Sequence, residues 1–300
     1  MLLKRGDVVC FLGDSITCAG IWEAELFEKV ASKGVKIYNC GVSGNRSYTA
    51  FSRIYEDCLI YNPSIVVVTL GINDIMSGTK NRKDPKIAKI IQKGIENYAD
   101  YMERIIKTIQ ASGATAVIGD PVPYDEGEGY SIPSSDCNCD LEQCREIIHE
   151  LAKTYKVEII PFNEEFKKTL LVKKVIEDRV HPNTAGYKLM AKTVERFFEL
   201  DVDDSEIFNL SQISKERLQA EKHFKDLSYI EYDWVAHSSF IERREYLRED
   251  KIMLAQKLLE DANEYVSRTA NAYLLANADL TRARAKLIEK TMELYEYYNK

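Results

Sequence analysis

Ser15, Asp178 and His181 are residue types that together can cleave an ester bond. A serine hydroxyl becomes a nucleophile near neutral pH when a neighbouring base takes its proton. His181 is the candidate base, because one of the other three histidines lies in a predicted helix and two lie in the last hundred residues. Asp178 precedes His181 by three residues. In a helical or tight turn this spacing puts both side chains on one side, where the carboxylate can orient the imidazole.

Acyl transfer also requires hydrogen-bond donors for the negative oxygen of the tetrahedral intermediate. The backbone N–H groups of Ser15 and Gly44 and the side-chain amide of Asn73 are suitable donors. Glycine at position 44 lets the backbone approach a substrate closely. Structural roles are the alternatives: Ser15 can cap a helix, Asn73 can form a turn, and Gly44 can serve the backbone conformation alone.

Four further polar residues lie beside these candidates. We expect Asp14 and Asp74 to hold loops by accepting hydrogen bonds from backbone N–H groups rather than to act in catalysis. Arg46 and Tyr48 follow Gly44 and are candidates for substrate binding, with a surface role as an equal alternative.

Five short runs rich in Val and Ile are predicted to be strands buried on both faces: residues 8–12, 35–39, 65–70, 115–119 and 157–161. Amphipathic segments predicted to be helices alternate with them or follow them: residues 21–32, 48–59, 85–112, 141–155, 163–174 and 183–200. This alternation favours a parallel sheet with helices on both faces. Ser15, Gly44 and Asn73 directly follow the first three strands. They are therefore expected at the carboxyl edge of the sheet, where binding sites collect.

Four segments in order resemble the four blocks of the GDSL/SGNH hydrolase family: GDS at 13–15, GVSGN at 41–45, GIND at 71–74 and DRVHPNTAGY at 178–187. The resemblance covers about residues 1–200. It implies an α/β fold, a three-layer α/β/α sandwich with a five-stranded parallel sheet of flavodoxin-like type. It also implies Ser15 as nucleophile and first oxyanion donor, Gly44 and Asn73 as the other donors, His181 as base and Asp178 as its partner.

Two positions depart mildly from the family pattern. The first block reads GDSIT rather than the fuller GDSL form, and Arg179 stands where a small or neutral residue is frequent. Neither departure is expected to affect the chemistry.

Composition narrows the classes of partner. The chain is 45% hydrophobic and 30% charged, with a net charge of −7, which gives no reason to expect nucleic acid or an anionic membrane as the main partner. No run approaches the roughly 18 apolar residues of a membrane span. The first residues lack the features of a secretory signal, so a cytoplasmic location is expected.

The seven cysteines are expected to be reduced and mostly structural. Cys137, Cys139 and Cys144 fall short of a four-ligand zinc pattern, so neither a metal nor a cofactor is expected.

Residues 201–300 differ from the rest in composition, and after Gly186 the chain contains neither glycine nor proline. Ser239 and Glu242 fit a capping box ahead of a long helical stretch, and apolar residues recur there at helical spacing. We therefore expect a catalytic domain over residues 1–200. A helical extension over residues 201–300 would follow it, as an oligomerisation arm rather than a lid.

The function that these observations favour is a serine esterase for small acyl groups, first of all acetyl groups on a carbohydrate. A lysophospholipase or thioesterase is the alternative within the same chemistry. Two other classes stay open. One is a magnesium-dependent phosphoryl hydrolase using Asp14, Asp74 and Asp120, against which the missing glycine-rich Lys-Ser/Thr loop counts. The other is a non-catalytic interaction protein using the helical extension.

Overall fold

Five parallel strands form the centre of the fold in the computed structural model, which describes residues 1–30, 33–76, 81–130, 135 and 137–202. The strands are β1 (Val8–Gly13), β2 (Lys36–Gly41), β3 (Ile65–Thr69), β4 (Thr115–Gly119) and β5 (Glu158–Ile160). They pair in the order β2-β1-β3-β4-β5, the flavodoxin-like order. Each observed strand begins and ends within two residues of its predicted range, so the predicted parallel sheet is confirmed.

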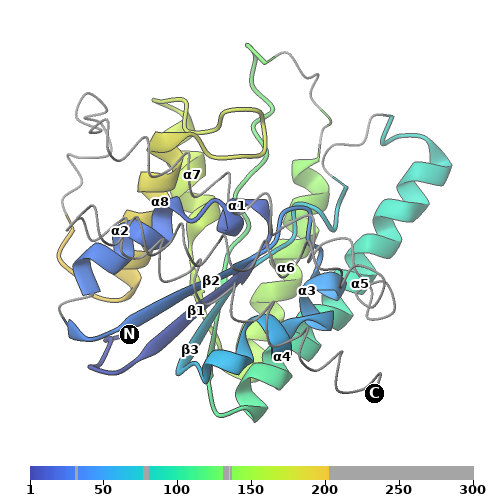
Figure 1. Ribbon diagram of the computed structural model, residues 1–300. Helices are drawn as coiled ribbons and strands as arrows, with labels where there is room; N and C mark the ends of the chain where they lie inside the picture. The colour runs from blue at the N-terminus through green and yellow to red at the C-terminus, as the bar shows by residue number, and fades with distance from the viewer. Residues whose placement is uncertain (31–32, 77–80, 131–134, 136, 203–300) are drawn as a thin grey trace, which may run out of the picture.

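Helices cover both faces of the sheet, which gives three layers (Figure 1). One face carries α2 (Ile21–Val30), α7 (Phe162–Leu170) and α8 (Thr184–Phe197). The other carries α3 (Ser47–Ser52), α4 (Ile54–Asp57), the 3₁₀ turn η2 (Leu59–Tyr61), α5 (Pro85–Ala111) and α6 (Asn138–Tyr155). The short helix α1 (Ser15–Cys18) directly follows β1. The predicted three-layer α/β/α sandwich is therefore confirmed.

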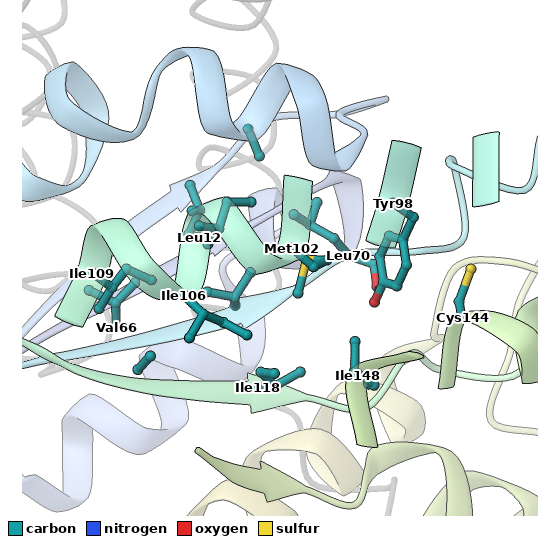
Figure 2. Packing of buried hydrophobic residues seen from close by; sticks show 14 of the residues in the cluster. Leu12, Val66, Leu70, Tyr98, Met102, Ile106, Ile109, Ile118, Cys144 and Ile148 are labelled. Atoms are coloured by element: carbon teal, nitrogen blue, oxygen red, sulfur yellow. The ribbon is translucent and has the colours of Figure 1, made fainter. Parts of the chain in front are cut away.

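Alternate strand residues build two separate apolar cores, because successive side chains of a strand point to opposite faces. Leu12 and Val66 belong to the core beneath α5 and α6, which Figure 2 shows with Met102 and Ile106 of α5 packed against the sheet. Phe11 belongs to the opposite core, where its ring packs edge-on against that of Trp22 with 4.7 Å between the ring centroids. Burial on both faces explains why the strands read as continuous apolar runs.

The predicted helix over residues 48–59 is wrong in one respect. The segment is divided into α3, α4 and η2, and Arg53 lies at the first break with non-helical backbone angles. The guanidinium of Arg53 is buried and hydrogen-bonded to segments at the end of the sheet, and this contact competes with continuation of the helix.

The predicted helical extension lies, from residue 203 onward, outside the described residues, so it stays a prediction. None of the described helices combines the length and the hydropathy needed to cross a lipid bilayer.

Candidate active site

The carboxyl ends of β1 and β2 place two candidate segments side by side. Gly13 and Gly41 are paired in the sheet register, and the segments containing Ser15 and Gly44 leave from them. A Cβ atom on Gly41 would lie 2.3 Å from the backbone nitrogen of Cys18 in α1. Only glycine therefore allows β2 to end so close to the helix that carries Ser15.

Ser15, His181 and Asp178 form one hydrogen-bonded row. Ser15 Oγ lies 2.9 Å from His181 Nε2. His181 Nδ1 lies 2.8 Å from Asp178 Oδ2. A serine, a histidine that can take its proton and a carboxylate behind that histidine are the groups required for nucleophilic acyl transfer. The structure thus brings Ser15 to two residues that lie more than 160 positions later in the chain.

A narrow loop between α7 and α8 presents the last two of these residues. An antiparallel bridge joins Ile176 to Pro182, and the N–H of Glu177 donates to the carbonyl of His181 at 2.8 Å. At the tip, Asp178 Oδ1 accepts hydrogen bonds from the N–H of Val180 at 3.1 Å and of His181 at 2.8 Å. The expected tight turn therefore exists, and it is a loop tip rather than a helical turn.

The hydrogen bonds around Asp178 favour its ionised form. Partial burial acts to raise the pKa of Asp178, but hydrogen bonds from the backbone and ring of His181 outweigh it and hold the pKa below its ordinary value. A carboxylate that stays charged at neutral pH can stabilise a protonated imidazole.

The predicted oxyanion donors occupy the same edge of the sheet. Ser15 is the first residue of α1, so its N–H has no acceptor within the helix. Gly44 is exposed, with a φ of +74° that favours glycine. Its N–H donates to no other residue in the described part of the chain. The Asn73 amide Nδ2 lies 3.1 Å from the carbonyl of Asn45 and 3.4 Å from Asp14 Oδ2.

Asp14 and Asp74 hold loops, as the sequence predicted. Asp14 Oδ1 accepts from the N–H of Ile16 at 3.0 Å, and Asp74 Oδ1 accepts from the N–H and the hydroxyl of Ser47 at 3.0 and 2.6 Å. Burial raises the pKa of Asp14 to about 7 and that of Asp74 to about 6. Their deep burial and internal partners fit a structural role.

Arg46 and Tyr48, the two candidates for substrate binding, make contacts within the protein at the start of α3. The backbone N–H of Arg46 donates to Thr49 Oγ1 at 2.8 Å at the start of α3. Tyr48 is 42% exposed, and the centroid of its ring lies 6.1 Å from that of Tyr101 in α5. Both residues follow Gly44 closely in the chain, which is compatible with substrate binding. No observation tests that role, and it stays a prediction.

Arg53 was not anticipated as part of the site. Its side chain is 4% exposed, and it donates from Nε to Asn45 Oδ1 at 2.7 Å and from Nη2 to the carbonyl of Gly13 at 3.1 Å. One side chain therefore ties the segment of Gly44 to the end of β1, just before Ser15. The signal in the sequence was a charge beside the apolar stripe formed by Ala50 and Ile54.

Arg179 lies between Asp178 and His181, and its side chain anchors the turn that carries them. Its side chain is 5% exposed and donates from Nη1 to the carbonyls of Asp125 and Gly127 at 2.7 and 3.0 Å. Its guanidinium also lies 4.6 Å from the ring centroid of Tyr130. The φ of Arg179 is +84°, a conformation that costs about 1–2 kcal/mol for residues with a side chain. These contacts offset that cost and fasten the turn to residues 125–130.

Replacing Arg179 by glycine is expected to lower kcat/KM for p-nitrophenyl acetate by about 10- to 100-fold, because small misplacements of catalytic groups have effects of this size. Glycine adopts a positive φ freely, so the loss reports the missing side-chain contacts rather than backbone strain. Steady-state rates and the Tm of both proteins check this. Arg104→Ala, on the exposed face of α5, is the control. Wild-type rates in Arg179→Gly would show that the turn holds without Arg179.

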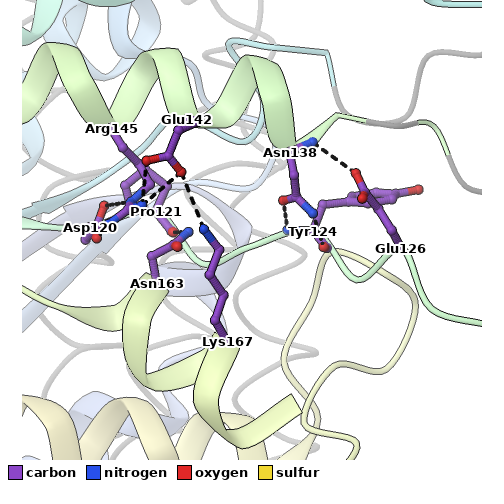
Figure 3. A network of polar contacts seen from close by, with 9 residues as sticks. All are labelled: Asp120, Pro121, Tyr124, Glu126, Asn138, Glu142, Arg145, Asn163 and Lys167. Atoms are coloured by element: carbon purple, nitrogen blue, oxygen red, sulfur yellow. Dashed lines mark hydrogen bonds and ion pairs between the residues drawn. The ribbon is translucent and has the colours of Figure 1, made fainter. Parts of the chain in front are cut away.

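The third acidic residue at a strand end is engaged elsewhere. The Asp120 carboxylate accepts from Arg145 Nε at 2.9 and 3.1 Å, and Arg145 Nη1 donates to Glu142 at 2.8 Å (Figure 3). Asp14, Asp74 and Asp120 thus have different partners. Among the described residues, their oxygen atoms do not form a group of three close enough together to hold one ion, which counts against a shared magnesium site.

One family profile and one sequence relative match most of the chain before residue 200. The sequence profile of the GDSL-like lipase/acylhydrolase family matches residues 11–189. An acetylxylan esterase from Geobacillus stearothermophilus is 24% identical over 215 residues, which are 65% of this chain and 95% of that protein.

Solved structures share the fold. A crystal structure of an acetylxylan esterase from Geobacillus stearothermophilus superposes with a TM-score of 0.57 at 19% identity, covering 68% of this chain and 100% of that chain. The structure of an alpha/beta hydrolase enzyme from the metagenome of Lake Arreo, Spain, gives a TM-score of 0.55 at 17% identity, covering 67% and 99% of the two chains.

Proposed function

The chain belongs to the GDSL-like lipase/acylhydrolase family and is a carboxylic ester hydrolase, and from that premise we propose that it uses Ser15, His181 and Asp178 to remove acetyl groups from a carbohydrate. The observation that carries the proposed chemistry is the row of hydrogen bonds at 2.9 and 2.8 Å that links Ser15 Oγ, His181 and Asp178. The sugar substrate draws its support from the acetylxylan esterase relative, which aligns over 95% of its own length.

The proposed reaction has two halves. Ser15 Oγ attacks the ester carbonyl while His181 Nε2 takes the hydroxyl proton, and His181 then protonates the leaving alcohol. Asp178 keeps the proton of the imidazole on Nδ1, so Nε2 is free to accept. Water, activated by the same histidine, attacks the acetyl-serine and releases acetate, which restores the starting enzyme.

The oxyanion is proposed to be bound by the N–H groups of Ser15 and Gly44 and by the amide of Asn73. Asn73 Nδ2 has two hydrogens, and its contact with Asp14 at 3.4 Å is longer than an ordinary N–H···O bond. The N–H that points to Asp14 can instead donate its hydrogen bond to the substrate oxyanion, while the bond to the carbonyl of Asn45 keeps the amide in place.

Replacing Asn73 by alanine is expected to lower kcat by about 10²–10³-fold, the usual effect of losing one oxyanion donor. KM should change little, because the donor acts mainly in the transition state. Rates across a range of p-nitrophenyl acetate concentrations separate the two constants. A variant with normal kcat would remove Asn73 from this role. A raised KM together with a lowered Tm would assign it to loop structure alone.

Acyl and alcohol preference test the proposed substrate. The purified protein is given p-nitrophenyl acetate, butyrate and octanoate, and in parallel acetylated xylo-oligosaccharides, with release of acetate measured. The proposal expects the highest kcat/KM with acetate and acetate release from the oligosaccharides. A preference for octanoate, with no release from the sugar, would instead favour a lipid or thioester substrate.

A further inference from the structure

Three buried thiols lie close together outside the active site. The sulfur atoms of Cys10, Cys40 and Cys58 are all within 4.8 Å of one another. The three residues are 0%, 3% and 0% exposed. No other group of His, Cys, Asp and Glu residues in the described ranges brings three ligand atoms so near to one another.

The fold itself brings these thiols together from three segments. Cys10 in β1 is paired with Tyr38, and Leu12 is paired with Cys40 in β2, so Cys10 and Cys40 are diagonal neighbours on one face of the sheet. Cys58 follows α4, and its carbonyl lies 3.7 Å from the sulfur of Cys10. β2 is an edge strand, which places the cluster near one side of the sheet.

The spacing suits three bonds to one atom. With sulfur bonds of about 2.3 Å, as thiolates make to zinc, three sulfurs around one centre lie no more than about 4.0 Å apart. Thiols that already lie within 4.8 Å of one another therefore need only small shifts to converge.

The surroundings select the kind of ligand. The three thiols lie in the apolar core with Leu12, Ile54 and other aliphatic side chains. Burial, followed by hydrogen bonding with Cys40, raises the pKa of the Cys10 thiol well above its ordinary range. A divalent ion bound by three thiolates would place a net charge in this core, which is costly. A trivalent metalloid bound by the same three sulfurs would be neutral.

We propose that Cys10, Cys40 and Cys58 form a binding site for a trivalent thiophilic metalloid, with arsenite as the ligand to be tested. The step is a condensation without any change of oxidation state. Three S–H bonds and three As–OH bonds break, three As–S bonds form, and three water molecules leave. Neutral arsenous acid and three protonated thiols thus give a neutral product, and no charge is buried.

We expect Arg53 to transmit the effect of arsenic binding at this cluster to the active site. Arg53 begins the segment that ends at Cys58, and it also holds Asn45 and the carbonyl of Gly13. Drawing Cys58 towards β1 shifts this segment and loosens the loop of Gly44. Esterase activity should therefore fall as arsenic binds. This last step rests on the proposed function, whereas the binding does not.

Intact-protein mass spectrometry after incubation with equimolar arsenite tests the binding. The wild type should gain one arsenic atom and lose three hydrogens. Cys10→Ala and Cys58→Ala should each weaken binding at least a hundredfold. The control is Cys137→Ala/Cys139→Ala, which removes two thiols that are close in the sequence and should bind as wild type. No adduct in the wild type, or an adduct lost only in the control, would overturn the proposal.

Arsenic X-ray absorption of the loaded wild type gives an answer that does not depend on the folding of any variant. Three sulfur neighbours are expected, and oxygen neighbours would contradict the site. The esterase assay then separates the two proposals. Loss of activity in the wild type but not in Cys58→Ala shows that arsenic at this cluster causes the loss, as the link through Arg53 requires. Unchanged activity with arsenic bound refutes that link. An untreated protein without esterase activity would overturn the proposed function while leaving the mass and absorption results to decide the site.

Discussion

Replacing Ser15 by alanine is expected to lower kcat/KM for p-nitrophenyl acetate by about 10⁴–10⁶-fold, because only binding and the oxyanion donors then remain. The fold should persist. The hydrogen bond that Ser15 Oγ makes with His181 is only partly buried, and alanine is well tolerated in a helix. Initial rates, with thermal unfolding of both proteins, therefore separate a loss of chemistry from a loss of structure.

Two controls sharpen this experiment. Ser52→Ala removes an exposed hydroxyl in α3 and should leave the rate unchanged. A chelator should also leave the wild-type rate unchanged, since no step of the proposed reaction uses a metal ion. Activity that survives in Ser15→Ala, or that disappears with the chelator, would instead favour a metal-dependent hydrolase.

Replacing Asp178 by asparagine is expected to lower kcat by about 10³–10⁴-fold. The asparagine oxygen can still accept the backbone N–H groups of Val180 and His181. Its amide then faces His181 Nδ1 and donates to it, which leaves the imidazole proton on Nε2. An imidazole in that form cannot accept the proton of Ser15. The turn is retained while the base is disabled.

Steady-state rates and Tm measure this effect, with Asp100→Asn as the matched control. Asp100 is paired with Arg104 on the exposed face of α5, where exposed pairs contribute little. Asp178→Asn should therefore keep a wild-type Tm while losing kcat, and the control should keep both. A loss of less than tenfold in Asp178→Asn would mean that His181 does not depend on Asp178 for its orientation.

The sheet could be predicted from the sequence because its signal is local. β3 is buried along its whole length and reads Ile-Val-Val-Val-Thr, a pattern typical of a strand covered on both faces. The positions of Ser15, Gly44 and Asn73 follow from the same pattern, since parallel strands end at one edge. The pairing of His181 with Asp178 followed from their spacing in the chain.

The supporting arginines could not be predicted in the same way. The role of Arg53 depends on Asn45 and Gly13, and Gly13 is 40 positions away in the chain. The role of Arg179 depends on carbonyl groups more than 50 positions earlier in the chain. In each case a residue that breaks a local rule, by a charge beside an apolar stripe or by a positive φ, is compensated by distant partners.

The most direct test of Ser15 as the nucleophile is covalent labelling by a fluorophosphonate, followed by mass spectrometry of the peptides. We expect one adduct per chain, on Ser15, formed together with the loss of esterase activity. We also expect no adduct in Ser15→Ala and much slower labelling in His181→Ala, because the histidine activates the serine. Esterase activity that is lost without an adduct on Ser15, or that is lost with an adduct on another residue, would contradict the role of Ser15 as nucleophile.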